Sequence, residues 1–597
     1  MISGAAAGSA WMSRQNLGAL LLFLIAAAAL HFPHYGSYVG DITRDFYLHY
    51  NWAKEFAENV SLGNPYPRWI FHGRLGLGEP VFVFYAPLYY FAVAAITTVG
   101  ISAWTATQLV GVLATAAFAW FVYRTCTYYI DARLSAIVGV VALGSPFLVM
   151  LNYKFDGIAW ATVGYASHGL LMWSVLRPQA SRRFVNLWAA TAIGVAVGSH
   201  VISALINLVC YSAIALITPE GSQRLPGRLA RSIGSWAATV ALGLGLSAIY
   251  LVPALLSLDL IRTDVWDSSV PFTAFSWPVF TQYLYPQRWF SFQWTISLPA
   301  LALVAVPMAY VLMHKGAPLI LTKVVVIAGV AVFFASELSF PLWAIRTPLE
   351  KIQLPFRFVS IAYTFGAVAA GLAIFHARGT GRKAWRLGLW AVLALSFGVG
   401  GLSLIKASYL DGQRLPPELR NDQYTFLPFI QVLRDSGACP GVDSGSDAEC
   451  RLRWSSSGSF RGTPEYRLQW AGPEYATYAK NGFPGHCEAK GVRCEAAQKT
   501  ATGRKWVITA SAAEVLVLPI FRFPSWATEI DGVRVTHGTD AATGLIAVQV
   551  PSGRHEVEVV WSPSGVERLG RNVTLAALAT LFTLGVLRAR PSLLRVK

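Results

Sequence analysis

The apolar run "LGALLLFLIAAAALHF" (Leu17–Phe32), followed closely by "GDITRDFYLHYNWAKE" (Gly40–Glu55), decides the fold. The first run belongs to a span near 17–33, because about 17 to 25 apolar residues cross a bilayer as a helix. In the second run Asp41, Asp45 and His49 are four residues apart, so a helix carries them on one side. The chain therefore leaves a membrane helix and soon presents two carboxylates and an imidazole.

The composition is that of a membrane protein. The chain has 597 residues, of which 54% are hydrophobic and only 13% charged, and its mean hydropathy is +0.47. Soluble domains carry about 25% charged residues, so most of this chain is expected in lipid. The net charge of +17 comes mainly from short loops between apolar runs. Without a basic stripe or a binding motif, nucleic acid is excluded as a partner.

The apolar runs and basic loops predict about 12 spans in a polytopic α-helical membrane protein. Spans are expected near 17–33, 104–123, 134–150, 157–176, 229–257, 294–313, 319–336, 358–377, 387–407 and 570–588. The run 186–218 is too long for one span and is expected to form two short helices that meet at "GSH" (198–200). Loops rich in Lys and Arg mark the cytoplasmic side. That pattern holds most simply if 82–100 dips into the membrane or lies along it without crossing, which makes 34–102 one outer loop.

The predicted domains are a GT-C-like membrane domain over 1–407, an extracytoplasmic β-rich domain over 408–568, and a final helix with a basic tail over 569–597. Strand-like alternation with Asp-Gly and Ser-Gly turns predicts the β domain. Four cysteines fall in this outer block, which favours disulfides but leaves their connectivity open: Cys439, Cys450, Cys487 and Cys494. Cys126 and Cys210 are expected to be packing residues. The first helix lacks a cleavage motif and is expected to be a retained span.

The first outer loop offers two interpretations. A carboxylate beside the membrane can act as a general base toward a hydroxyl, or the two aspartates can simply favour a helix N-terminus. Further on, the aromatic and proline-rich stretch 62–90 is expected to rest on the lipid interface. Arg68 and Arg74 in it could clamp a phosphate or reach toward lipid headgroups. Its glycines precede a proline and lack the ending of a phosphate loop.

The stretch from Gly40 to Tyr90 resembles the first outer loop of the GT-C superfamily of membrane glycosyltransferases, most closely a branch of YfhO-like and related bacterial proteins. The positions that carry the resemblance are Asp45, His49, Gly63, Pro67, Trp69, Gly76, Gly78, Phe84, Tyr85, Pro87 and Leu88. "GVAVGSHVISAL" (194–205), "KIQLPFRFVSIA" (351–362) and the β-rich tail are also similar to that branch. The resemblance covers most of the chain.

The resemblance implies a polyprenyl-phosphate-linked sugar as donor, a lipid or glycan hydroxyl as acceptor, and a site on the outer side of the bacterial inner membrane. Asp45 is the first choice for the catalytic base and Asp41 the second, with His49 beside them. The candidate substrate-binding residues are Asp156, Lys154, Arg68, Arg74, His200, Arg288, Arg346 and Arg357. Asp156 fits a helix N-cap equally well. No metal site is predicted, although a divalent metal at the aspartates is left open because family members differ.

Three other classes of protein compete with an enzyme. A transporter or flippase of lipid-linked saccharides would show inverted repeats and buried charges near the mid-membrane, and the sequence shows neither. A non-catalytic envelope-assembly protein would bind polysaccharide through its outer β domain. A signalling receptor lacks support, because every inner loop is short.

Overall fold

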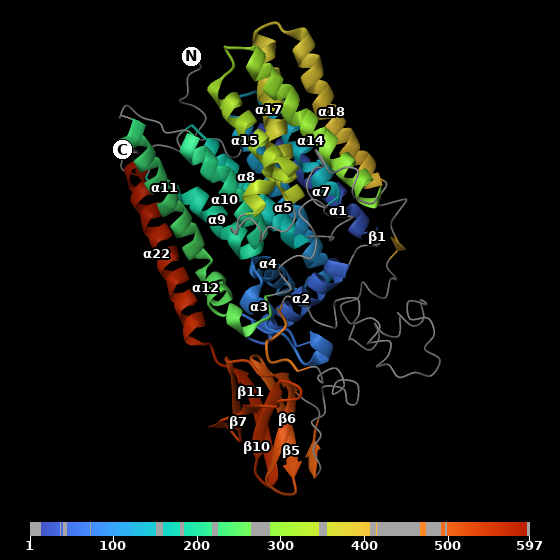
Figure 1. Cartoon of the computed structure of the whole chain (residues 1–597), viewed down its shortest axis with the longest axis vertical. Helices are drawn as coiled ribbons and strands as arrows, with labels where there is room; N and C mark the ends of the chain where they lie inside the picture. Colours follow the sequence, from blue (N-terminus) through green and yellow to red (C-terminus); the bar gives the residue numbers. More distant parts are fainter. Residues whose placement is uncertain are drawn as a thin grey trace.

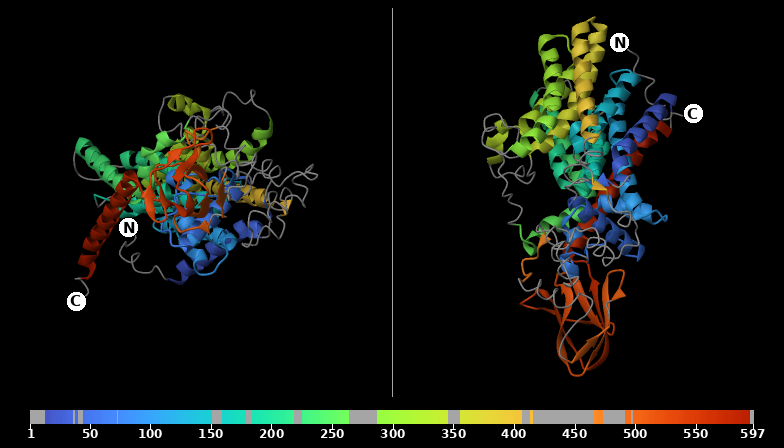
Figure 2. Two further views of the ribbon diagram at one scale, coloured as in Figure 1. Left: turned by 90° about the horizontal axis from the view of Figure 1, so that it is seen from below. Right: turned by 90° about the vertical axis from the view of Figure 1, so that its right-hand side faces the viewer.

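The computed structural model describes residues 13–35, 38–39, 44–71, 73–150, 159–178, 184–217, 225–263, 287–344, 355–405, 413–414, 466–472, 491–495 and 498–593. A bundle of long helices fills one end of the molecule, and a β domain forms the other end (Figure 1). The first-loop helices lie between these two parts, as the right-hand view of Figure 2 also shows.

The long helices follow the apolar runs, because in lipid a helix satisfies its own backbone polar groups. The helices formed by these runs, both long and short, are α1 (Arg14–Tyr35), α5 (Ala103–Cys126), α6 (Ala132–Leu143), α7 (Pro146–Met150), α8 (Ala159–Leu176), α9 (Leu187–Ser199), α10 (Val201–Ile217), α11 (Leu225–Leu246), α12 (Ala248–Leu256), α14 (Gln287–Met313), α15 (Leu319–Ala335), α17 (Val359–Gly379), α18 (Lys383–Ile405) and α22 (Gly565–Leu593). Side chains of Ser102, Asp131 and Asn186 cap the first turns of α5, α6 and α9.

Within the described residues, eight helices are long and apolar enough to cross a membrane. With the composition, they identify a multi-span membrane protein, while the full count of twelve stays a prediction. Two of the predicted spans are broken rather than continuous. The run 134–150 divides into α6 and α7 at Gly144, and 229–257 divides into α11 and α12 at Ser247, whose hydroxyl donates to the Gly194 carbonyl.

α17 is the most completely buried of these spans and is packed against α14, α15 and α18. Glycines let neighbouring helices approach closely, as is usual where spans associate. A Cβ added at Gly371 of α17 would lie 2.5 Å from Val138 of α6, and one at Gly169 of α8 would lie 2.9 Å from the Phe118 carbonyl of α5. The predicted division of 186–218 is confirmed, since α9 ends at Ser199 and α10 begins at Val201.

The first outer loop contains α2 (Arg44–Ser61), the 3-10 turn η1 (Arg74–Gly76), α3 (Val81–Phe84) and α4 (Leu88–Thr97). The apolar run 82–100 therefore forms short helices and no span-length one. The ten residues of α4 rise about 15 Å, which is half of the roughly 30 Å hydrocarbon core. Before α2, β1 (Tyr38–Val39) pairs with β2 (Gln413–Arg414), which follows α18 in the chain.

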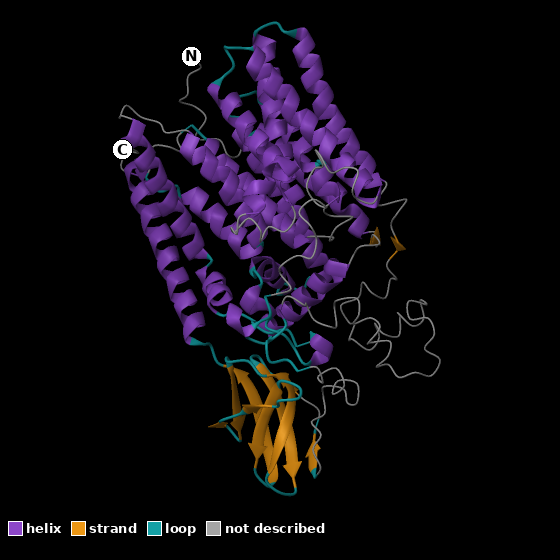
Figure 3. Cartoon of the chain, in the orientation of Figure 1, coloured by secondary structure: helices purple, strands orange, loops and turns teal. Residues whose placement is uncertain are grey.

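The β domain consists of two antiparallel sheets (Figure 3). One sheet has the strand order β3 (Val492–Cys494), β5 (Gly503–Ala510), β11 (Gly553–Trp561), β7 (Trp526–Ile530) and β8 (Val533–Val535), with β4 (Gln498–Lys499) also paired to β5. The other has the order β6 (Glu514–Phe521), β10 (Leu545–Val550) and β9 (Gly538–Thr539). Alternate residues of β5 and β11 are fully buried, including Trp506 and Val557, as expected where one face of a sheet is covered.

The turn and cysteine predictions can be compared with this domain. Asp531 and Gly532 both have positive φ, 51° and 77°, so they form the tight turn expected of an Asp-Gly pair between β7 and β8. Cys494 is disulfide-bonded, while Cys439, Cys450 and Cys487 lie outside the described residues. Cys126 and Cys210 are buried free thiols, which confirms their assignment to packing.

Candidate functional site

The stretch 62–80 packs against the β domain, which corrects the expectation that it rests on lipid. The Trp69 ring lies 5.3 Å from Trp526, 5.8 Å from Phe523 and 6.1 Å from Trp561. Gly78, at φ +86°, makes this approach feasible, because a Cβ there would lie 2.0 Å from Trp69 Nε1. The aromatic residues that suggested an interfacial loop instead bury one another between two domains.

A buried ion pair fixes Arg68. Its Nε lies 3.4 Å from Glu567 Oε1, its Nη1 donates to the Phe82 carbonyl at 3.2 Å and its Nη2 to the Ile249 carbonyl at 2.9 Å. The guanidinium also stacks on Tyr66 at 3.5 Å, and burial raises the pKa of that phenol to about 12. With a protein partner at each nitrogen, Arg68 is a structural anchor, and the phosphate clamp stays a prediction for this residue.

Glu567 connects three parts of the chain. It forms a reciprocal capping box with Ser564 at the start of α22, and it accepts hydrogen bonds from Ser525 at 2.9 Å and from the Trp561 indole at 3.2 Å. Together with the Arg68 pair, these contacts join the first loop, the β domain and the last helix at one buried carboxylate. The helix begins at Gly565, four residues before the predicted boundary.

Arg74 is also held by a carboxylate. Its Nε lies 3.7 Å from Glu79 Oε2, and the two side chains are 3% and 0% exposed. Ile70 and Glu79 form an antiparallel bridge across this turn, and Arg74 itself has a φ of 47°. A buried arginine beside a carboxylate inside a tight turn shapes the loop. The phosphate clamp stays a prediction for Arg74 as well.

A third arginine, on the β domain, completes this interface. Arg504 stacks on the Phe71 ring at 4.6 Å and donates to the Gly76 carbonyl at 3.3 Å. Glu55 of α2 accepts from the Phe71 backbone N–H at 2.6 Å. Burial lowers the pKa of Arg504 to about 10, and the Glu55 charge opposes that shift. The face of α2 that carries Glu55 is thus tied to the β domain.

His49 lies in a buried aromatic pocket between α2 and α4. Its Nδ1 is 2.5 Å from the Tyr90 hydroxyl, and its ring lies 4.9 Å from Trp52 and 5.2 Å from Tyr85. Burial lowers the pKa of His49 well below its ordinary value, and the charge of His200 lowers it further. His49 is therefore a neutral imidazole at pH 7 and can accept or donate a hydrogen bond but supplies no positive charge.

His200 lies at the break between α9 and α10 and is electrostatically coupled to His49. Its Nδ1 is 2.7 Å from the Ser203 hydroxyl, and Gly164 of α8 leaves room for both residues. The break itself is held close to the first loop, because a Cβ at Gly198 would lie 3.5 Å from Leu88 of α4. The two-helix turn predicted from "GSH" therefore delivers His200 to the base of the first loop.

Arg357 is the third member of this group. It lies in the 3-10 turn η8 (Pro355–Phe358), directly before α17, and its charge acts on His200. The neighbouring Phe356 contacts Phe147 of α7, with ring centroids 6.2 Å apart. We call His49, His200 and Arg357 the cationic cluster after the guanidinium of Arg357, whose charge acts on the imidazole of His200. Its three members come from segments far apart in sequence.

The remaining candidates are placed less fully. Asp45 lies in α2, one helical turn before His49, and Arg288 lies in the first turn of α14, but the side chains of both are outside the described parts. Asp41, Lys154, Asp156 and Arg346 lie outside the described residues. Within the described residues, no group of three or more His, Cys, Asp or Glu could hold a metal ion.

Sequence reasoning missed the residues that line the His49 pocket. Tyr90 carried only the interface signal of "FYAPLYY", and Tyr85 was noted as a position of the family resemblance but not as a site residue. Tyr466 comes from the outer block, stacks on Phe84 at 6.1 Å and lies 6.4 Å from Tyr85. Glu567 had a readable signal, because Ser564 and Glu567 have the spacing of a capping box. No pattern in the sequence indicated that Arg68 would pair with Glu567.

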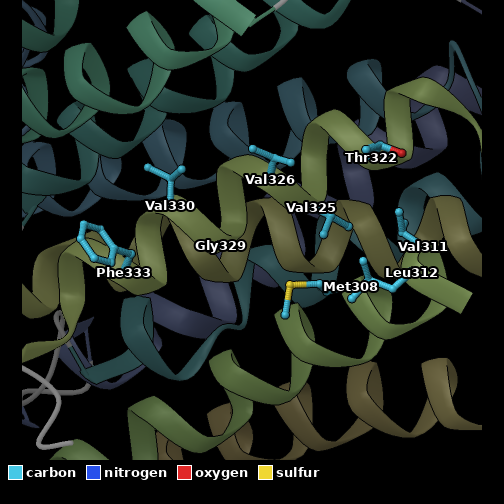
Figure 4. A pocket seen from close by; sticks show the side chains of 9 residues that line it. All are labelled: Met308, Val311, Leu312, Thr322, Val325, Val326, Gly329, Val330 and Phe333. Atoms are coloured by element: carbon cyan, nitrogen blue, oxygen red, sulfur yellow. The ribbon is translucent and has the colours of Figure 1, made fainter. Parts of the chain in front are cut away.

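An apolar groove runs along α15 on the surface of the bundle (Figure 4). It encloses about 430 Å³ between α14 and α15 and is lined by Met308, Val311, Leu312, Thr322, Val325, Val326, Gly329, Val330 and Phe333. From Thr322 to Phe333 the helix rises about 16 Å, close to half of the hydrocarbon core. At the Phe333 end, the adjacent Phe334 stacks on Phe358 at 5.0 Å, which is the residue after Arg357.

No protein-family model matches the sequence, and no curated protein matches it. Among solved structures, the chain is similar to the arabinofuranosyltransferase AftD from Mycobacteria (15% identity, TM-score 0.44), over 70% of this chain and 28% of that one. It is also similar to ArnT from Cupriavidus metallidurans bound to undecaprenyl phosphate (13%, 0.40; 66% and 77%). A third is the Archaeoglobus fulgidus oligosaccharyltransferase in complex with zinc and sulfate (13%, 0.38; 75% and 57%). TM-scores below 0.5 do not establish a common fold, and this chain spans little more than a quarter of AftD.

Proposed function

We propose that this chain is a membrane glycosyltransferase of the GT-C type, in or near the YfhO-like branch. It moves a sugar from a polyprenyl-phosphate donor to the hydroxyl of a lipid or glycan acceptor. The site faces the extracytoplasmic side of a bacterial inner membrane, the side on which the charge pattern of the loops places the β domain.

One observation carries this proposal. Three separate segments of the sequence resemble the family, and each contributes one member of the cationic cluster: His49 from the first loop, His200 from "GSH" and Arg357 from "LPFRF". A chance resemblance gives no reason for these residues to act on one another. A guanidinium with two hydrogen-bonding imidazoles at the end of apolar helices suits an anionic headgroup attached to an apolar chain.

The cationic cluster and the groove along α15 support a binding position for the donor. Arg357 and His200 bind the phosphate and stabilise the negative charge that grows on it as the sugar leaves. The groove along α15 receives part of the polyprenyl chain, because it is apolar, opens on the outer surface of the bundle and ends beside η8. The acceptor then approaches from the side of the first loop and the β domain.

The transfer step uses a carboxylate of the first loop. The acceptor oxygen attacks the anomeric carbon, the bond from that carbon to the phosphate oxygen breaks, and polyprenyl phosphate leaves with the bonding pair. Asp45, or Asp41 in its place, takes the proton from the acceptor hydroxyl. His49, one turn beyond Asp45 and held by Tyr90, orients that carboxylate or the acceptor as a neutral hydrogen-bonding group. Lys154, Asp156, Arg288 and Arg346 are proposed to contact the substrates.

The test is a strain that lacks the protein, analysed by mass spectrometry of its envelope glycans and lipids. We expect one glycosylated species to disappear and the wild-type chain to restore it. Asp45→Asn should lower the restored transfer by about 10² to 10⁴, the usual contribution of a general base. Arg554→Ala, on the exposed face of β11, is the matched control and should restore the species fully.

Two outcomes would contradict the proposal. If Asp45→Asn and Asp41→Asn both keep full activity in a folded protein, a non-catalytic role in envelope assembly is favoured. If the glycan profile of the deletion strain is unchanged while transport of a lipid-linked saccharide or a small solute is altered, a transporter is favoured.

A further inference from the structure

A line of polar side chains runs from the cationic cluster into the helix bundle. His200, which precedes α10, is followed on that helix by Ser203, Asn207 and Tyr211, at steps of three, four and four residues. This spacing puts them on one face of the helix. Ser203, Asn207 and Tyr211 are 2%, 3% and 0% exposed, so the polar face is turned into the protein and away from lipid.

The opposing face belongs to α8 and carries a histidine. Gly164 lies against His200 and Ser203, since a Cβ there would be 3.0 Å from Ser203 Oγ. His168, one turn further, is 1% exposed, and its Nδ1 is 3.1 Å from the Tyr211 hydroxyl. Long helical side chains point back toward the helix N-terminus, so the Tyr211 hydroxyl lies near the level of Asn207. Asn207, Tyr211 and His168 therefore share one level of the bundle.

Two buried polar atoms at this level have no hydrogen-bond partner within the described part of the chain. The single Tyr211 proton can go to the His168 carbonyl, 3.2 Å away, and His168 Nδ1–H then donates to the phenol oxygen. That tautomer makes His168 Nε2 an acceptor. Within the described part of the chain, neither His168 Nε2 nor Asn207 Nδ2 has a hydrogen-bond partner, and both are buried. One is a lone-pair acceptor and the other an N–H donor.

We propose that the α8–α10 interface binds a short file of water molecules that bridges Asn207 Nδ2 and His168 Nε2 and continues past Ser203 to His200. A water molecule accepts from the asparagine and donates to the imidazole, which satisfies both atoms at once. Buried waters in proteins occupy such polar positions with two to four partners, and an unsatisfied polar group within a membrane domain is costly.

The water file gives the polar column a function. It connects a histidine of the proposed site with a histidine in the middle of α8, so the two imidazoles exchange protons through water and the Ser203 hydroxyl. It also keeps α8 and α10 joined by hydrogen bonds at a depth where the neighbouring contacts of His168, Phe118 and Phe365, are apolar. This inference does not depend on the reaction that the chain performs.

Radiolytic hydroxyl-radical labelling of the purified full-length protein tests the proposal, because radicals formed from bound water modify the side chains beside it. Tyr363 of α17 is the internal control: it is 1% exposed and its hydroxyl donates to the Ile296 carbonyl. We expect Tyr211 and His168 to be modified several-fold faster than Tyr363. Equal rates would mean a dry interface and would overturn the proposal.

Asn207→Leu separates the two cases a second time, because leucine keeps the branching and the number of heavy side-chain atoms but has no hydrogen-bonding group. If water bridges the two atoms, the variant leaves His168 Nε2 unpaired, so labelling of Tyr211 falls to the Tyr363 level and the melting temperature drops. If the interface is dry, the variant removes an unpaired donor, so labelling is unchanged and the melting temperature rises. Unchanged labelling together with a higher melting temperature would contradict the proposal, whatever the ratio of labelling rates in the wild type.

Discussion

Two regions of this molecule gather buried arginines and histidines, and they use them in opposite ways. At the interface between the first loop and the β domain, each cation acts on a carboxylate: Arg68 on Glu567, Arg74 on Glu79 and Arg504 on Glu55. In the cationic cluster, the guanidinium of Arg357 acts on the imidazole of His200, and His200 acts on His49. A guanidinium paired with a buried carboxylate fixes a structure, whereas we propose that the guanidinium of the cationic cluster binds an anion.

The difference shows that an arginine in an outer loop cannot be interpreted alone. Arg68 and Arg357 follow similar proline-containing, aromatic stretches, "NPYPRW" and "QLPFRF". Arg68 receives from the last helix the carboxylate of Glu567, which neutralises it. The partner decides whether a guanidinium is an anchor or a ligand, and the partner lies elsewhere in the chain.

The largest effect is expected from breaking the Glu567 contacts. Glu567→Ala removes the partner of Arg68, Ser525 and Trp561 together with the capping box. Breaking a buried ion pair by removing one partner costs about 3–5 kcal/mol. Thermal unfolding followed by tryptophan fluorescence measures it. Glu556→Ala, whose pair with Lys505 is exposed, should change stability by less than about 1 kcal/mol. Equal losses in the two variants would refute the structural role of Glu567.

The second-largest loss of stability is expected from overpacking the first loop at Gly78. Gly78→Ala places a Cβ against Trp69, a ring held by three other aromatic residues. Overpacking costs about 1–3 kcal/mol, and a left-handed φ adds about 1–2 kcal/mol for a residue with a Cβ. Gly63→Ala is the control, because Gly63 has a similar φ of +97° with nothing within 4 Å. If both variants melt together, the close contact with Trp69 is not limiting.

Much of the architecture could be predicted from local pattern. The long spans, the helix break at His200 and the Asp-Gly turn all depend on residues close together in sequence, whereas the prediction that 82–100 does not cross came from counting the crossings of the whole chain. Hydropathy did not reveal the break at Ser247, because the hydroxyl that stabilises it bonds to Gly194 of another helix. The structural role of Arg68 was hidden for the same reason, since its carboxylate belongs to the far end of the chain.

The candidate site was predictable in part. His49, His200 and Arg357 were each chosen from their own segments, and Arg357 acts electrostatically on His200 as His200 does on His49. The tyrosines around His49 were not chosen, because "FYAPLYY" has the composition of an ordinary interface stretch and its meeting with α2 requires tertiary packing. Tyr466 reaches the same pocket from the outer block, and its sequence surroundings carry no motif.

A smaller effect concerns pH and tests the burial of His49. Its pKa is lowered in the folded protein, so the unfolded chain takes up a proton first as the pH falls through about 6.5. The folded state therefore loses stability on acidification below that pH. In His49→Gln this contribution is absent, so the melting temperature should fall less between pH 7.5 and 5.5 than in the wild type. An identical slope in both proteins would mean that His49 is protonated as easily when folded as when unfolded.

The smallest effect comes from an exposed pair on the β domain and has the opposite sign. His555 Nδ1 lies 2.7 Å from Asp531 Oδ2, and this contact raises the pKa of His555 and lowers that of Asp531. A raised histidine pKa contributes stability below about pH 6.5 that is lost as the pH rises through the folded value. Asp531→Asn keeps a residue that tolerates the positive φ of this turn but removes the charge. Its melting temperature should fall slightly relative to wild type at pH 6 and less at pH 8. An equal deficit at pH 6 and pH 8 would show that the backbone hydrogen bond from Glu556 to Asp531, and not the charge, is what matters, because that bond is present at either pH.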